Sequence, residues 1–196
     1  MLLGADVKIE QLNIEKECMK MEAYYLAKLI QWAPGSELRS RKRMQKVVYL
    51  LQTAGCKSLD AEFTLHHYGP YSQDVAALTD QMVAGGLLIE KAEPNQQMGF
   101  SYSYQLSEEA AKSLAEFEAD EYGRSAVAGI VPFKSQASEL LGKDVRELEY
   151  AATVAYFYLQ TKNWEEAKGK TCEFKGIPPG GTDVRAAAKL ALRFVA

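Results

Sequence analysis

Apolar residues recur with a helical period along the first fifty positions of the chain. Four of them lie three or four residues apart: Met19, Ala23, Leu26 and Ile30. This spacing predicts a helix from about Lys16 to Trp32, which ends before Pro34 because proline disfavours a helical conformation at the residue preceding it. A second helix is expected from about Glu37 to Ala54, with Gly55 ending it in a left-handed conformation. Its apolar face carries Met44, Val47, Val48 and Leu51.

The stretch "AEFTLHHY" interrupts the helical pattern. It is short and rich in aromatic and β-branched residues, which predicts a strand from about Glu62 to Tyr68. After the Gly-Pro step, the Ser72 hydroxyl can cap a third helix, with Asp74 in the first turn where the helix dipole favours negative charge. This helix ends at Gly85 and Gly86. Its buried stripe consists of Val75, Leu78, Thr79, Met82 and Val83.

Two β-like runs, "LLIEKAEP" and "FSYSYQLS", follow this helix and are separated by "NQQMG". They predict a hairpin in which Tyr102 and Tyr104 share one face, with Ser101 and Ser103 on the other. The order is therefore helix, helix, strand, helix, hairpin. That order is typical of a winged-helix domain, the helix-turn-helix variant that ends in a β-ribbon.

The second half of the chain has a helical pattern throughout. One helix is expected from Ser107 to about Tyr122, a less regular linking segment follows, and a final helix capped by Thr182 ends at Phe194. Between them, a further helix has the apolar stripe Val145, Leu148, Ala152, Ala155 and Leu159. The fold class is thus α+β, mainly α: a winged-helix-like domain at 1–106 and a helical C-terminal region at 107–196 packed on it.

The composition is that of an ordinary globular protein, with 196 residues, 47% hydrophobic and 25% charged. No apolar run approaches the roughly 20 residues that span a bilayer, and the N-terminus lacks signal-peptide features, so we expect a cytoplasmic protein without membrane contact. Cys18, Cys56 and Cys172 are odd in number and widely spaced, which favours buried free thiols over a disulfide framework or a zinc site. The net charge of −3 gives no global attraction to nucleic acid.

Three stretches resemble the uncharacterised YwgA-like proteins of bacteria and archaea: "RKRMQKVVYLLQTAG", "FTLHHYGPYSQDVAALTDQMVAGGLL" and "ELEYAATVAYFYL". The resemblance implies a winged-helix-like fold with a helical C-terminal part, and no established activity. A more distant similarity is to the Panacea antitoxin domain, in which a basic helix like "KRMQKVVYL" is also followed by a Gly-Pro step. That similarity implies a protein that neutralises a toxin by binding it.

The segment between the strand and the third helix is the first candidate site. The candidate interaction groove comprises His66, His67, Tyr68, Gly69, Pro70, Tyr71 and Ser72. The two histidines would point to opposite faces of a strand, one toward the core and one toward solvent, so we expect neither a metal nor a cofactor there. The Gly-Pro step is explained by chain geometry alone, since it places Ser72 at the cap position. The alternative is that Tyr68 and Tyr71 border a groove that receives an anionic group at the helix N-terminus.

A basic run in the second helix is the second candidate site. The candidate anion or nucleic-acid patch consists of Arg39, Lys42, Arg43 and Lys46. If Met44 marks the buried direction, Arg39, Lys42 and Lys46 share the opposite, solvated face and could bind phosphates. The other interpretation is a charged face that confers solubility. The third helix carries Asp74 and Asp80 and no basic residue, which disfavours reading DNA in the usual way.

No catalytic motif stands out in the sequence. The "GKT" at 169–171 lacks the first glycine of a phosphate-binding loop, where Trp164 stands instead, and Glu149 is interpreted as a partly buried, hydrogen-bonding structural carboxylate. The leading prediction is a non-catalytic regulatory protein that binds another protein in an antitoxin-like manner. The first alternative is a DNA-binding regulator that uses the basic face, with dimerisation left open. The second is an enzyme with a pocket around His66, Tyr68 and Tyr71.

Overall fold

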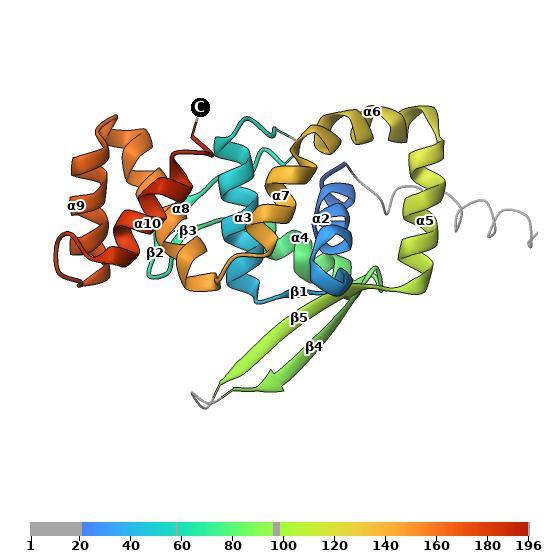
Figure 1. Ribbon diagram of the computed structural model, residues 1–196. Helices are drawn as coiled ribbons and strands as arrows, with labels where there is room; N and C mark the ends of the chain where they lie inside the picture. Colours follow the sequence, from blue (N-terminus) through green and yellow to red (C-terminus); the bar gives the residue numbers. More distant parts are fainter. Residues whose placement is uncertain (1–20, 58, 96–98, 196) are drawn as a thin grey trace, which may run out of the picture.

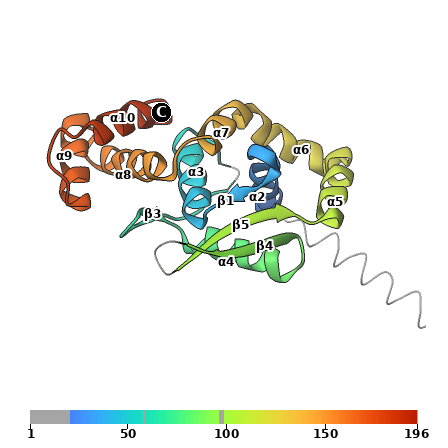
Figure 2. The ribbon, with the colours of Figure 1, turned by 60° about the horizontal axis from the view of Figure 1, so that its bottom comes forward.

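The computed structural model describes residues 21–57, 59–95 and 99–195 (Figure 1). Within them the protein is mainly helical with a small antiparallel sheet, which confirms the predicted α+β, mainly α class. Two views agree that α9 and α10 lie at one end of the molecule and α5 at the other, with α2 and α3 between them (Figures 1 and 2). No helix in the described ranges is long and apolar enough to cross a membrane.

The described residues of the first half form three helices, a three-stranded sheet and a short extra hairpin. Its helices are α2 (Met21–Trp32), α3 (Arg41–Thr53) and α4 (Gln73–Ala84). Its strands are β1 (Leu38–Arg39), β2 (Thr64–His66), β3 (Gly69–Tyr71), β4 (Leu88–Pro94) and β5 (Phe100–Leu106). The sheet has the order β1-β5-β4 with antiparallel pairs, so the predicted hairpin is confirmed. This β4–β5 hairpin projects from the body of the molecule (Figure 1).

The second helix starts later than predicted, because the residues before it form strand β1. Leu38 lies opposite Tyr104 of β5 and is fully buried. Ser40 has a φ of 84° and donates its backbone N–H to the carbonyl of Tyr102, so helical geometry cannot begin before Arg41. The helix expected from Lys16 is present from Met21, and its predicted start lies outside the described residues.

The strand predicted at 62–68 is instead the first arm of a tight hairpin. β2 pairs antiparallel with β3, and the turn between them falls at His67 and Tyr68. The third helix agrees with its prediction: the Ser72 hydroxyl accepts a hydrogen bond from the backbone N–H of Val75, and Val75, Thr79 and Met82 are buried.

The second half consists of helices that cover the first half from two sides. They are α5 (Glu108–Ala119), α6 (Glu121–Ile130), α7 (Lys134–Leu141), α8 (Val145–Thr161), α9 (Trp164–Lys175) and α10 (Thr182–Ala191). The turns η1 (Pro34–Ser36) and η2 (Val131–Phe133) link neighbouring elements. Helix α8 packs against α3 and β3 as well as against α9 and α10, and α7 packs against α2 and α3. One continuous core therefore includes residues of both halves.

Three helix boundaries in this half differ from the sequence predictions. The helix expected to reach Tyr122 breaks at Asp120, whose extended ψ of 158° separates α5 from α6, and the expected linking segment is largely helix α6. Thr182 is the first residue of α10 rather than its cap, which is Gly181, and α10 ends at Ala191 rather than at the predicted Phe194. Of the predicted stripe of α8, Leu148, Ala152 and Ala155 are buried, while Val145 and Leu159 at its ends are only partly buried.

Candidate functional site

A hollow of about 410 Å³ opens between α3, the β2–β3 hairpin and α4, and we call it the hairpin groove. From the predicted interaction groove it takes in His66, His67, Tyr68, Gly69 and Tyr71. From the predicted basic patch it takes in Lys42 and Lys46. The structure therefore joins two candidate sites that the sequence analysis treated separately.

Contacts with two helices hold the hairpin beside this groove. Gly69 has a φ of 87°, and it lies so close to α8 that an added Cβ would sit 2.5 Å from the Thr153 hydroxyl. On the α3 side, the Gln45 amide donates to the carbonyl of Ser72 and accepts from its backbone N–H, at 2.9 and 2.8 Å. Pro70 and Ser72 are buried and do not line the groove, so these two predicted site residues fix the hairpin rather than contact a ligand.

Both histidines are exposed, so the expectation that one faces the core is wrong. The reason is the turn: only His66 lies on a strand, while His67 is a turn residue on a hairpin that projects toward solvent. The His66 ring packs against Tyr71 with centroids 4.8 Å apart, and His67 packs against Tyr68 at 4.9 Å.

No group of three His, Cys, Asp or Glu residues arranged to hold a metal occurs in the part of the chain that the structure describes. Cys56 and Cys172 are buried free thiols, as predicted, and Cys18 lies outside the described residues.

The predicted basic face of the second helix is not a solvated patch. Lys46 is only 2% exposed, Arg43 donates to the carbonyls of Leu141 and Lys143, and Arg39 lies on β1, paired with Glu37. The prediction assumed that only the side of the helix that carries Met44 is buried, whereas α7, α8 and β3 all pack against α3. A run of five apolar residues, 47–51, was the sequence signal for a helix buried on every side.

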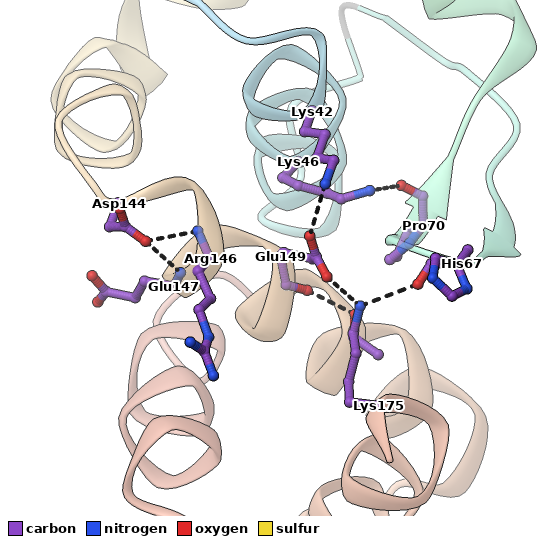
Figure 3. Close-up of polar contacts among 10 residues, drawn as sticks. Lys42, Lys46, His67, Pro70, Asp144, Arg146, Glu147, Glu149 and Lys175 are labelled. Carbon is purple, nitrogen blue, oxygen red and sulfur yellow. Dashed lines mark hydrogen bonds and ion pairs between the residues drawn. The ribbon is translucent and has the colours of Figure 1, made fainter. Parts of the chain in front are cut away.

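Two groove-lining lysines, Lys42 and Lys46, lie with Lys175 around one carboxylate, and we call these three residues the lysine cluster (Figure 3). Glu149 of α8 accepts a hydrogen bond from Lys175 at 2.5 Å and lies 3.8 Å from the Lys42 ammonium. Lys46 donates to the carbonyl of Pro70 at 2.5 Å. The Glu149 side chain is 14% exposed, which confirms the predicted partly buried, hydrogen-bonding carboxylate.

Burial lowers the pKa of Lys46 to about 7, because a charged ammonium loses hydration inside the protein. The Glu149 carboxylate favours the charged form of Lys46, and the ammonium groups of Lys175 and Lys42 oppose it. The cluster thus contains an amine that gains and loses its proton near neutral pH.

Arg41 joins the groove to the β4–β5 hairpin, a link that the sequence analysis did not predict. Its guanidinium donates to the Tyr104 hydroxyl at 2.8 Å and to Glu90 at 2.9 Å, and the Tyr104 hydroxyl donates to Glu90 at 2.6 Å. The guanidinium also stacks on the ring of Tyr102, 3.7 Å from its centroid. Burial and the Glu90 hydrogen bond raise the pKa of Tyr104 above its usual value. The charge of Arg41 is therefore balanced within the protein.

The fold and the groove define a mainly helical α+β protein with a small antiparallel sheet and a hollow beside a short hairpin. No family model matches the chain. The chain is similar to the uncharacterized protein YwgA of Bacillus subtilis (strain 168), with 25% identity over 132 residues that cover 67% of this chain and 73% of the relative. This similarity confirms the predicted resemblance to the YwgA-like proteins, while the resemblance to the Panacea domain stays a prediction.

Proposed function

We propose that this chain is a non-catalytic, cytoplasmic regulatory protein of winged-helix type that binds another protein in the hairpin groove. The groove itself carries the proposal. Its floor includes apolar Met44, Val75 and Ala76, and its rim includes Tyr68, which is 49% exposed. An apolar floor with aromatic and polar residues around it is typical of sites that receive side chains of a partner protein.

The order of elements supports the winged-helix part of the proposal. The chain runs through α2, α3 and α4 before the β4–β5 hairpin, whose strands belong to the sheet of order β1-β5-β4, and in this proposal that hairpin corresponds to the wing. The β2–β3 hairpin is inserted before α4, the helix that enters DNA in winged-helix regulators. Because α4 contains Asp74 and Asp80 and no basic residue, its charge favours a protein partner over a phosphate backbone.

The DNA-binding alternative would need the side chains of the predicted basic patch to be free. Lys46 is buried and Arg43 is held by backbone carbonyls, while the side chains of Lys42 and Arg39 are exposed in part. Releasing Lys46 and Arg43 would break contacts inside the protein, so the geometry supports a protein partner better.

An enzyme is the second candidate function, because the groove also contains His66, Tyr68 and Tyr71 together with Lys46, whose pKa near 7 suits proton transfer. If the protein is an enzyme, its turnover rate should depend on the protonation state of Lys46. That rate should change near pH 7, and turnover should be lost in Lys46→Met. Partner binding without turnover argues for the first candidate.

Photo-crosslinking in the host cell tests the proposed function. A photoreactive phenylalanine at position 68 should crosslink one protein in stoichiometric yield, and the product should survive nuclease and high salt. The matched control places the same residue at Phe100, which is 60% exposed on the β4–β5 hairpin and outside the groove. Equal crosslinking from both positions, or a crosslinked product that nuclease digests, would rule out a protein partner in the groove.

A further inference from the structure

The lysine cluster holds more positive charge than its neighbouring carboxylate balances. Lys42, Lys46 and Lys175 lie around Glu149, whose carboxylate favours the charged form of Lys46. Lys46 and Lys175 have side chains that are almost completely buried. Like charges held together away from water favour the approach of a further anion.

Lys42 is the member of the cluster that can receive this anion. Its side chain is 41% exposed, and its ammonium is 3.8 Å from Glu149, too far for a hydrogen bond. The ammonium lies 3.2 Å from the centroid of the Tyr68 ring and makes no hydrogen bond within the described parts of the chain. An ammonium has three donors, so Lys42 has donors available for an acceptor in the groove.

The other charged residues of the groove leave a net positive charge at the end of the groove next to the β2–β3 hairpin, which we call its hairpin end. Arg41 is already balanced by Glu90 and bonded to Tyr104. Asp80 is the single acid among the described groove-lining residues. It lies seven residues after Gln73 on α4, so the helical rise separates the two residues by about 10 Å along the helix axis. Gln73 accepts a hydrogen bond from Tyr71 of β3 and so marks the hairpin end. An acidic group fits beside Lys42, and an apolar group fits the floor at Met44, Val75 and Ala76.

We propose that the hairpin groove recognises an acidic segment of the partner protein, with an Asp or Glu carboxylate of that segment bound by the Lys42 ammonium. The inference rests on the proposed function, since it specifies the chemistry of the partner. The bound carboxylate accepts hydrogen bonds from Lys42 next to the Tyr68 ring, and it balances a second charge of the lysine cluster. Apolar side chains beside the acid pack on the groove floor.

Two synthetic peptides with blocked ends test this recognition on the full chain. One is a hexapeptide that alternates leucine and glutamate, and the other has glutamine in place of each glutamate. Each is titrated into the ¹⁵N-labelled protein while amide shifts are recorded. The acidic peptide should shift residues 42–46 and 66–73, bind at least about tenfold more tightly than the glutamine peptide, and weaken as salt rises. Equal affinity of the two peptides, or shifts confined to other surfaces, would overturn the inference.

Two further probes separate an acidic peptide from other anions. Inorganic phosphate and a mixed-sequence DNA duplex are titrated in the same way. Weaker binding of both than of the acidic peptide supports the inference, because neither probe offers an apolar group to the floor. Tighter binding of the duplex at the same residues would assign the site to nucleic acid and overturn it.

Lys42→Gln tests the role of Lys42, with Lys112→Gln as its matched control. Lys112 lies on α5 and is paired with Glu116 at 3.9 Å, so its substitution removes the same charge from a similar ion pair away from the groove. Lys42→Gln should weaken the acidic peptide about tenfold, Lys42→Arg should retain it, and Lys112→Gln should leave it unchanged. Equal losses from the two glutamine variants would refute a role for Lys42, and the ¹⁵N spectra show whether each variant is folded.

The peptide titrations and the crosslinking experiment can fail separately. If a partner crosslinks from position 68 but the two peptides bind equally, the proposed function holds and the acidic recognition is wrong. If the acidic peptide binds at Lys42 but no protein crosslinks, carboxylate recognition holds and the proposed function is wrong.

Discussion

Gly69 is the residue at which the β2–β3 hairpin touches helix α8. Its φ of 87° is unfavourable for any residue with a Cβ, and that Cβ would meet the Thr153 hydroxyl and the Glu149 carbonyl. We expect Gly69→Ala to lower the free energy of unfolding by about 3 kcal/mol, because backbone strain and a steric clash add at one position. Urea denaturation measures the loss.

Gly86→Ala is the matched control for this substitution. Gly86 also has a positive φ, of 73°, but nothing lies within 4 Å of an added Cβ. Strain alone should then cost about 1 kcal/mol. If both alanine variants lose the same free energy, the close approach of the hairpin to α8 does not contribute to stability.

Lys46 makes the stability of the protein depend on pH. Its pKa is about 7 in the folded protein and near its usual 10.5 in the unfolded chain. Between these values the unfolded chain binds a proton that the folded protein lacks, so stability rises with pH, by at most about 1.4 kcal/mol per unit. Below pH 7 both states bind the proton, and the contribution of Lys46 stays constant at its lowest value.

Lys46→Met removes this titration. The free energy of unfolding of the wild type minus that of the variant should increase from pH 7 to pH 9, as measured by urea denaturation at several pH values. The neighbouring charges are Glu149, Lys42 and Lys175, which remain in both proteins. The same difference measured with Lys112→Met should not change with pH. If the difference for Lys46→Met does not change with pH either, the Lys46 ammonium is not desolvated in the folded protein.

Individual residues were predictable where a local interaction determines them. Ser72 caps α4 through its own hydroxyl, and a serine before an acidic first turn indicates that role directly. Lys46 was not predictable in the same way, because its burial depends on β3 and α8, which approach α3 from distant parts of the sequence. The groove could be inferred in part from Tyr68 and Tyr71, but the cluster around Glu149 could not.

At the scale of elements, one hydrogen-bonded triad attaches the β4–β5 hairpin to the start of α3. Tyr104 of β5 is fully buried and bonds to both Arg41 and Glu90. Tyr104→Phe should lower the free energy of unfolding by about 1–2 kcal/mol, because hydrogen bonds to charged groups are lost from a buried site. Chemical denaturation of the variant provides the measurement.

Tyr102→Phe serves as the control for the triad. The Tyr102 ring stacks on Arg41, and its hydroxyl makes no hydrogen bond among the residues that the structure describes. The change should therefore cost less than about 0.5 kcal/mol. A loss as large as that of Tyr104→Phe would show that the hydrogen bonds of the triad do not account for the effect of removing the Tyr104 hydroxyl.

Elements with strong periodicity were predicted well, and short elements were not. The β4–β5 hairpin and the stripe of α8 follow from alternation and from helical spacing within each segment. Strand β1 is two residues long and exists because Leu38 pairs with Tyr104, far along the chain. The two turn residues His67 and Tyr68 are neither glycine nor proline, and the Gly69-Pro70 step that follows them was interpreted as placing Ser72 rather than as part of a hairpin, so the turn was not predicted.

At the scale of the whole molecule, packing joins the predicted N-terminal and C-terminal regions. Helix α8 covers α3 and β3 with small buried residues, among them Ala151, Ala152 and Ala155. Small side chains let two helices approach closely, and the core that results includes residues from both regions. The division at residue 106 stays a prediction about sequence organisation, while the packing indicates one folding unit.

The two tryptophans of the sequence report on the two regions separately, because Trp32 lies in α2 and Trp164 in α9, stacked on Tyr158. In Trp32→Phe and in Trp164→Phe, the fluorescence of the remaining tryptophan and the far-ultraviolet circular dichroism should give the same urea midpoint. Coincident transitions are expected because α8 cannot leave α3 without exposing the shared core. If Trp164 fluorescence changes at lower urea than the helical signal, α9 and its neighbours unfold first, and the β2–β3 hairpin loses the α8 surface that positions Gly69 beside the groove.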